Sequence, residues 1–356
     1  MNRFNKYIFY IVSVLLMLAG CEKESEVPVR NPQIVLDPGM SDTGSPAKAT
    51  VFDKYADMTD PSKGGGNFSV RAYKSGTEDK FLYDQRVWYF QDGRSWHFYD
   101  DAINNVTEIY WPNATNIDFF SYMPYHNAKL HTGVTLGEYT AANGPSFSCN
   151  LPLDTDGQKN IHEFIYAYSK NQNKHSTGSD GREGVVQLNF VHPFSLIVIQ
   201  LNESYRMTIN WIRIRGLYNK GTYANPQTTL SQGDSPVNFT CASWTPEAGA
   251  VRRALEIDIN KNVPDDINYK SPIGGPYIIM PQSLDNDVIL DINYTRDQTK
   301  IETKSISLYR ETLPQWDPGK KYTYSLTMGD PLEEILFNVA VEEWSVVDYK
   351  NEIGVE

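Results

Sequence analysis

The chain has 356 residues and a formal net charge of −12, with a pI near 5.0. Nucleic-acid-binding domains and proteins that bind anionic bilayers usually carry a basic surface, so this charge balance argues against both classes. Twenty prolines, 24 glycines and 23 tyrosines, with no long helical period, predict an all-β chain with many turns.

The first 20 residues have the organisation of a bacterial export signal. Residues 2–6 carry two basic side chains and no acid, and residues 7–18 form an apolar run too short for a stop-transfer helix. The sequence Leu-Ala-Gly-Cys at 18–21 resembles a lipobox, in which the cysteine is acylated and the preceding peptide is removed. We therefore predict a lipoprotein signal peptide over 1–20 and lipidation of Cys21. An ordinary secretory signal followed by a chance cysteine is the alternative.

Residues 21–48 are predicted to form a flexible tether that could act as a propeptide. They contain several acids and prolines, and residues 39–45 are mostly small, so the segment buries too little apolar surface to fold alone. The acidic cluster after Cys21 resembles the surface-export signal of Bacteroidetes lipoproteins. We expect an outer-membrane lipoprotein that faces the outside of the cell.

Two regions of short alternating strands predict two β-sandwich domains. In the first, residues 68–73 alternate at period two, and aromatic-rich runs at 85–90 and 95–99 flank an Asp-Gly turn. In the second, residues 255–260, 288–294 and 322–328 alternate. Residues 169–183 contain no apolar residue, so we place the boundary there. The predicted domains are an N-terminal one over 49–183 and a C-terminal one over 184–356.

The last strand of the predicted C-terminal domain is strongly apolar on one face. Ile335, Phe337, Val339 and Val341 alternate with other residues and precede a mostly polar tail. A terminal strand of this kind can complete its own sheet or that of a neighbour, so we interpret these residues as a candidate donor strand.

Neither catalysis nor metal binding is indicated by the remaining motifs. The six histidines lack metal-ligand spacing, and His192, before Pro193, is interpreted as a structural hydrogen-bonding residue. No nucleophile elbow, phosphate loop or dinucleotide fingerprint occurs, and the acidic pairs are poorly placed for a glycosidase. Cys149 and Cys241 could form one disulfide, although two half-buried thiols are favoured. We expect a protein without enzymatic activity, cofactor or metal.

Several motifs together resemble the Bacteroidetes fimbrillin family. They are residues 68–73, Tyr-Trp-Pro at 110–112 followed by 118–125, Leu-Asn-Phe-Val-His-Pro at 188–193, Ile-Met-Pro-Gln at 279–282 and the run 316–324 before a last strand that ends at Trp344. Each motif alone is weak. Their order and their spread from about residue 45 to the C-terminus, behind a lipobox, carry the resemblance.

The resemblance implies a subunit of type V pili with two transthyretin-like β-sandwich domains, exported as a lipoprotein. In that family, an arginine-specific protease removes the N-terminal strand, and the C-terminal strand of another subunit fills the exposed groove. An opened sheet edge is a template for strand addition, so the mechanism is physically sound. The implied partners are other fimbrillin subunits, the outer membrane and a surface glycan or protein receptor.

The sequence departs from the family pattern at the expected cleavage site. Where many relatives have arginine before Ala-Thr, this chain has Lys48. Arg30 is the nearest upstream arginine. Cleavage at Arg30, a protease that accepts Lys48, and a subunit that is never cleaved all remain open, and the last would leave an anchor or stand-alone surface protein.

A carbohydrate-binding surface lipoprotein that does not polymerise is the competing hypothesis. It rests on aromatic residues that cluster in one region and could stack on sugar rings: Trp88, Tyr89, Trp96, Tyr99, Tyr110 and Trp111. Aromatic residues also fill sandwich cores, which is the favoured interpretation. The two differ in exposure, because a sugar platform needs several coplanar rings that face solvent.

Overall fold

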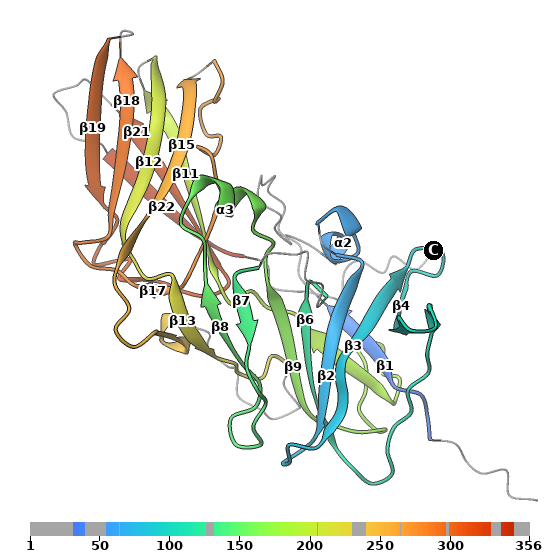
Figure 1. Ribbon diagram of the computed structural model, residues 1–356. Helices are drawn as coiled ribbons and strands as arrows, with labels where there is room; N and C mark the ends of the chain where they lie inside the picture. The colour runs from blue at the N-terminus through green and yellow to red at the C-terminus, as the bar shows by residue number, and fades with distance from the viewer. Residues whose placement is uncertain are drawn as a thin grey trace, which may run out of the picture.

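The computed structural model describes residues 31–39, 55–63, 65–125, 132–204, 206–229, 240–263, 265–296, 299–328 and 336–344. Figure 1 shows two groups of long strands at opposite ends of an elongated molecule, with shorter strands between them. The prediction of an all-β chain with two β-sandwich domains is confirmed. The helices in the described residues are neither long nor apolar enough to cross a membrane.

The N-terminal domain is built on a six-stranded antiparallel sheet. In spatial order its strands are β5 (Asn105–Val106), β4 (Ser95–Asp100), β3 (Lys80–Phe90), β2 (Asn67–Lys74), β6 (Ile117–Met123) and β9 (Ile165–Gln172). All residues of β6 are buried, because both faces of the sheet are covered. Phe119 belongs to one apolar core and its neighbour Phe120 to another, as alternation along a strand requires.

One face of this sheet is covered by a parallel pair, β1 (Val35–Gly39) and β10 (Val185–Asn189). The flexible-tether prediction for 21–48 is therefore wrong for residues 31–39. They fold because Ile34 and Leu36 are buried in the N-terminal core, and because Ile34 N–H donates to the carbonyl of Ile109 at 2.7 Å. The boundary at 183/184 stays a prediction, and β10, just beyond it, packs in the N-terminal core.

A four-stranded sheet lies between the two sandwiches and draws strands from both halves of the chain. Its strands are β14 (Trp244–Pro246), β13 (Lys220–Ala224), β8 (Ser146–Asn150) and β7 (Val134–Leu136). Its aromatic residues share a third core with the outer face of the six-stranded sheet. The short helices are α2 (Tyr55–Met58), η1 (Pro61–Lys63), α3 (Thr155–Asn160) and η2 (Cys241–Ser243). Asp154 caps α3 by accepting a hydrogen bond from Gly157 N–H at 2.7 Å.

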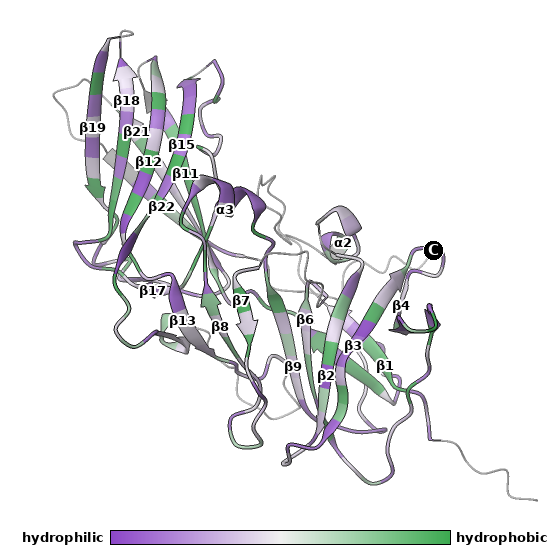
Figure 2. Ribbon diagram, in the orientation of Figure 1, coloured by the Kyte–Doolittle hydropathy of each residue, from purple (hydrophilic) through white to green (hydrophobic). Residues whose placement is uncertain are grey.

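The C-terminal domain packs two four-stranded sheets against each other. One contains β15 (Arg253–Val263), β12 (Met207–Leu217), β18 (Ile289–Arg296) and β19 (Lys300–Ser307). The other contains β16 (Tyr277–Ile279), β11 (Ser195–Ser204), β21 (Lys320–Met328) and β22 (Leu336–Glu343). A small pair, β17 (Gln282–Ser283) and β20 (Gln315–Trp316), lies at one end. Figure 2 shows apolar and polar residues alternating along these strands.

The two cysteines in the described residues are both free and buried. Burial raises the pKa of the Cys149 thiol to about 12, so this thiol stays protonated and poorly reactive at neutral pH. The structure thus has the two separate thiols that the sequence favoured over a disulfide.

Asp291 provides a test of the fold's acid stability. Burial disfavours its charged form, but hydrogen bonds from Arg215 at 2.7 Å, Ser305 at 2.7 Å and Arg213 at 3.1 Å outweigh this cost and lower the carboxyl pKa. Because the carboxyl pKa is lower in the folded state, the ionised carboxylate stabilises the folded protein at pH values above the unfolded-state pKa of about 3.9. This stabilisation is lost as the pH falls through the lower folded pKa.

We therefore expect Asp291→Asn to lower the free energy of unfolding at pH 7 by about 1.5 kcal/mol, a modest value because both arginines are partly exposed. The difference between wild type and variant should shrink below about pH 4. Urea unfolding of both proteins at several pH values measures this difference in unfolding free energy. Asp92→Asn, at an exposed turn residue, is the control and should have no comparable effect. A difference that stays constant down to pH 2 would contradict the role of the ionised carboxylate.

Candidate functional site

The candidate donor strand lies at the edge of a sheet. Of the predicted site residues, Cys21, Arg30, Lys48 and Ile335 lie outside the described residues. Phe337, Val339 and Val341 belong to β22, which pairs with β21 and ends the sheet order. Val339 is half-buried against the C-terminal core, whereas Val341 is 48% exposed. From residue 338 to 343, β22 therefore adds little apolar burial to the domain.

Trp344, directly after β22, is the anchor of this strand. It is 1% exposed, and its backbone N–H donates to the carbonyl of Gly319 at 2.7 Å. Its indole stacks on the His192 ring with centroids 4.3 Å apart and planes at 13°. The indole N–H has no acceptor among the described residues. Packing, rather than a side-chain hydrogen bond, therefore holds Trp344.

The ring beneath Trp344 is held by a buried side-chain hydrogen bond. His192 Nδ1 contacts a carboxylate oxygen of Glu163, and both side chains are at most 1% exposed. His192 lies between β10 and β11, and Glu163 lies just before β9. The expected structural hydrogen bond of His192 is confirmed. The anchor role of Trp344 was not foreseen, since the sequence marks only an aromatic residue at the end of an alternating run.

A second feature is the first strand, β1, and the segment before it, which cover part of the N-terminal core. Apart from its pairing with β10, β1 borders a cavity of about 340 Å³ whose wall includes Val87, Trp96 and Phe98. Ile34 and Leu36 are the residues of this segment that enter the N-terminal core. Removal of β1 would expose apolar side chains of that core and one edge of β10.

The aromatic cluster does not form a flat platform. Trp111 and Tyr99 are 1% and 7% exposed. Among the half-buried rings, Tyr89 and Trp96 are inclined at 54°, and Trp88 meets Tyr99 at 63°. The guanidinium of Arg86 covers Trp88 at 4.2 Å. These residues are inclined and packed as in a core, so they lack the coplanar, solvent-facing arrangement that a sugar platform needs.

Within the described residues, no group of three or more His, Cys, Asp and Glu side chains could hold a metal ion. What distinguishes β22 and β1 is their strand pairing and their burial. The edge of β22 and the seat of β1 are two places where another chain could pair with this one.

Several solved structures are similar to this chain. The chain is similar to a fimbrial protein from Bacteroides vulgatus, with 17% identity and a TM-score of 0.54 over 88% of this chain and 100% of that one. It also resembles a candidate cell adhesion protein from Bacteroides uniformis, with 13% identity and a TM-score of 0.49 over 88% and 98% of the two chains. The tip fimbrial protein Mfa3 from Porphyromonas gingivalis, truncated at its C-terminus, has 10% identity and a TM-score of 0.40 over 88% of this chain and 100% of that one.

None of the curated proteins matches the chain. The family model described as fimbrillin-like matches residues 55–344. This match runs from α2 to Trp344 and so includes both sandwiches and the terminal strand. The chain belongs to the fimbrillin-like family.

Proposed function

We propose that this chain is a lipid-anchored surface subunit of a type V pilus that assembles by strand exchange and serves adhesion. The observation that carries the proposal is β22, an edge strand with one buried anchor, Trp344, between residues 338 and 344. Residues 338 to 343 add little apolar burial to the domain, so release of Trp344 would free this part of the strand to pair with another chain. No catalytic role is part of this proposal.

The seat of β1 is the proposed acceptor. Once β1 has left, the edge of β10 offers unpaired backbone groups, and the positions of Ile34 and Leu36 become apolar sockets. A donor strand would supply backbone hydrogen bonds to that edge and alternate apolar side chains to the sockets. Val339 and Val341 of β22 have this two-residue spacing.

The position of β1 favours Lys48 over Arg30 as the maturation site. Cleavage after Arg30 would leave residues 31–39 attached to the domain, and the acceptor would stay covered. Cleavage after Lys48 would detach the segment that carries β1. We therefore infer a protease that accepts lysine at this position.

Cys21 is the proposed lipid acceptor. Each buried methylene of an acyl chain contributes about 0.8 kcal/mol, so a multiply acylated N-terminus holds a domain at the outer membrane. If cleavage after Lys48 removes Cys21 from the subunit, the lipid anchor is lost when the acceptor opens. An uncleaved copy would stay attached and could serve as an anchor or as a surface protein that does not polymerise.

Lys48→Ala is expected to abolish polymerisation, and Arg30→Ala is expected to leave it intact. The full-length protein would be treated with a trypsin-like protease, followed by intact-mass measurement and electrophoresis in SDS without boiling. Wild type and Arg30→Ala should give a species that begins at Ala49 and an SDS-resistant ladder. Lys48→Ala should stay monomeric.

The opposite pattern, with polymerisation lost only in Arg30→Ala, would contradict the assignment of the cleavage site. Wild-type protein that is cut after Lys48 but forms no ladder would contradict strand exchange. It would favour the carbohydrate-binding or anchor lipoprotein instead.

A further inference from the structure

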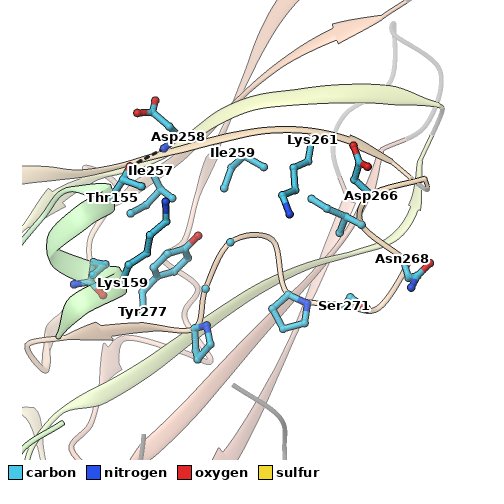
Figure 3. Close-up of a pocket in the computed structure, with 16 residues that line it drawn as sticks. Thr155, Lys159, Ile257, Asp258, Ile259, Lys261, Asp266, Asn268, Ser271 and Tyr277 are labelled. Carbon is cyan, nitrogen blue, oxygen red and sulfur yellow. Dashed lines mark hydrogen bonds between the residues drawn. The ribbon is translucent and has the colours of Figure 1, made fainter. Parts of the chain in front are cut away.

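The C-terminal domain has a cavity of about 650 Å³ that strand exchange does not use. It lies between the edge of β15 and the loop that leads into β16, and α3 closes one end (Figure 3). Pockets that bind small molecules have volumes of about 300–1,000 Å³. The cavity is therefore large enough for one or two sugar rings.

The edge of β15 beside this cavity is blocked against strand addition. The N–H of Asp258 already donates to Thr155 Oγ1 at 2.9 Å, and the N–H of Asn262 donates to the Asp266 carboxylate at 2.9 Å. Between them Asn260 has φ +48°, at a bulge where the register with β12 shifts. Bulges and capped edges prevent pairing with another strand. The hollow thus suits a compact ligand better than an extended peptide.

Two ammonium groups enter the cavity from different elements. Figure 3 shows Lys159 of α3 and Lys261 of β15 directed into the space between the strand and the loop, with the Asp258 carboxylate directed away from it. In the described part of the chain neither lysine forms an ion pair. Asp266 also lines the cavity, and its carboxylate accepts hydrogen bonds from the backbone N–H and the side-chain amide of Asn262. With that carboxylate engaged and the Asp258 carboxylate directed away, the two ammonium groups favour an anionic ligand group.

The other lining groups suit hydroxyl and C–H groups. Thr155 Oγ1 accepts its hydrogen bond from the backbone, so its proton is available to a ligand oxygen. Ser271 and Asn268 add donors and acceptors on the loop side, and Ile259 and Pro272 supply apolar surface. A sugar acid combines a carboxylate, several hydroxyls and an apolar ring face, and it fits this set.

The loop owes its close approach to a pair of glycines. Gly274 has φ +72°, and a Cβ there would lie 2.4 Å from Ile259 Cδ1. A Cβ on Gly275 would lie 2.8 Å from the ring of Tyr277. The wall of the cavity therefore depends on residues without side chains.

We propose that this cavity binds the carboxylate-bearing sugar of an acidic glycan, with Lys159 and Lys261 holding the carboxylate. The proposal rests on the adhesive role proposed above and names a receptor class for it. The binding itself belongs to the single chain, so it can be measured on uncleaved monomer, and failure of polymerisation would not affect the result.

Isothermal titration of the full-length monomer with glucuronate, galacturonate and N-acetylneuraminate tests the proposal. Glucose, galactose, acetate and sulfate are the comparison ligands. At least one sugar acid should bind more tightly than every comparison ligand, and binding should weaken as salt rises. The double variant Lys159→Ala/Lys261→Ala should lose at least about tenfold in affinity.

Lys74→Ala/Lys80→Ala is the control and should bind as wild type does. It removes two exposed lysines of the N-terminal domain, one paired with Asp79 at 3.1 Å and the other 4.0 Å from the centre of the Tyr83 ring. Both mutated pairs are exposed, so unchanged thermal unfolding should verify their folding. Three results would overturn the proposal: no binding of any sugar acid, equal binding of acetate or sulfate, or sugar-acid binding that the Lys159/Lys261 variant retains.

Discussion

Trp344→Ala is expected to detach β22 from the C-terminal domain under conditions in which the rest of the fold stays intact. The substitution removes the one buried side chain between residues 338 and 344 and empties the seat on His192. Truncation of a buried tryptophan to alanine costs about 3–5 kcal/mol. Backbone pairing with β21, half-buried Val339 and the exposed ion pairs of Glu342 and Glu343 remain, and surface ion pairs contribute little.

Hydrogen exchange followed by mass spectrometry measures this detachment. Peptides that cover β22 and β21 should lose protection in Trp344→Ala, while peptides of β2, β6 and β9 should keep it. Matured Trp344→Ala should also form the SDS-resistant ladder faster than wild type, because its donor strand leaves its own sheet more readily.

Val341→Ala is the control, since that side chain is 48% exposed and its truncation should change stability by less than about 0.5 kcal/mol. If β22 in Trp344→Ala exchanges as slowly as in wild type, another contact holds the strand. Global unfolding of the variant would instead show that the seat on His192 supports the whole molecule.

The alternating strands were the part of the fold that the sequence predicted well. Residues 255–260, 288–294 and 322–328 correspond to β15, β18 and β21, whose buried apolar side chains lie on one face. Alternation reports directly which residues face the core, so a strand with one solvent face can be recognised without knowing its partner.

The first strand could not be recognised in this way. Residues 31–39 contain one short apolar run, Ile-Val-Leu at 34–36, between two prolines and without alternation. Their partner strand β10 lies about 150 residues further along the chain. Nothing in the local pattern shows that a parallel partner will cover Leu36. The same local composition fits a flexible tether and a strand, and pairing with a distant part of the chain determines which of the two forms.

The anchor and the cavity were missed for a related reason. Glu163, His192 and Trp344 lie far apart in the sequence, and the tertiary fold brings them into contact. Lys159 and Lys261 likewise come from a short helix and a distant strand. Such sites depend on tertiary structure, and the only local signals were a histidine before proline and a tryptophan after the last strand.

A reversible cross-link between β21 and β22 is expected to switch polymerisation off and on. Thr323 and Ala340 are opposite each other in the antiparallel register. Opposite residues in such pairs have Cα atoms about 4.5–5.5 Å apart, which is within the range that a disulfide needs. In oxidised Thr323→Cys/Ala340→Cys, β22 cannot leave its sheet, so the matured protein should form no ladder. Reduction with dithiothreitol should restore the ladder.

A matched cross-link elsewhere in the domain shows whether introduced cysteines and oxidation by themselves affect polymerisation. Asn293 and Thr303 are opposite each other in β18 and β19, and their side chains form a hydrogen bond at 2.9 Å. Neither strand takes part in the proposed exchange, so oxidised Asn293→Cys/Thr303→Cys should polymerise like wild type. The native thiols should not interfere, because both are buried and the Cys149 pKa is raised to about 12. A ladder that persists when β21 and β22 are cross-linked would show that β22 is not the donor. Such a ladder would then have to come from another strand of the chain.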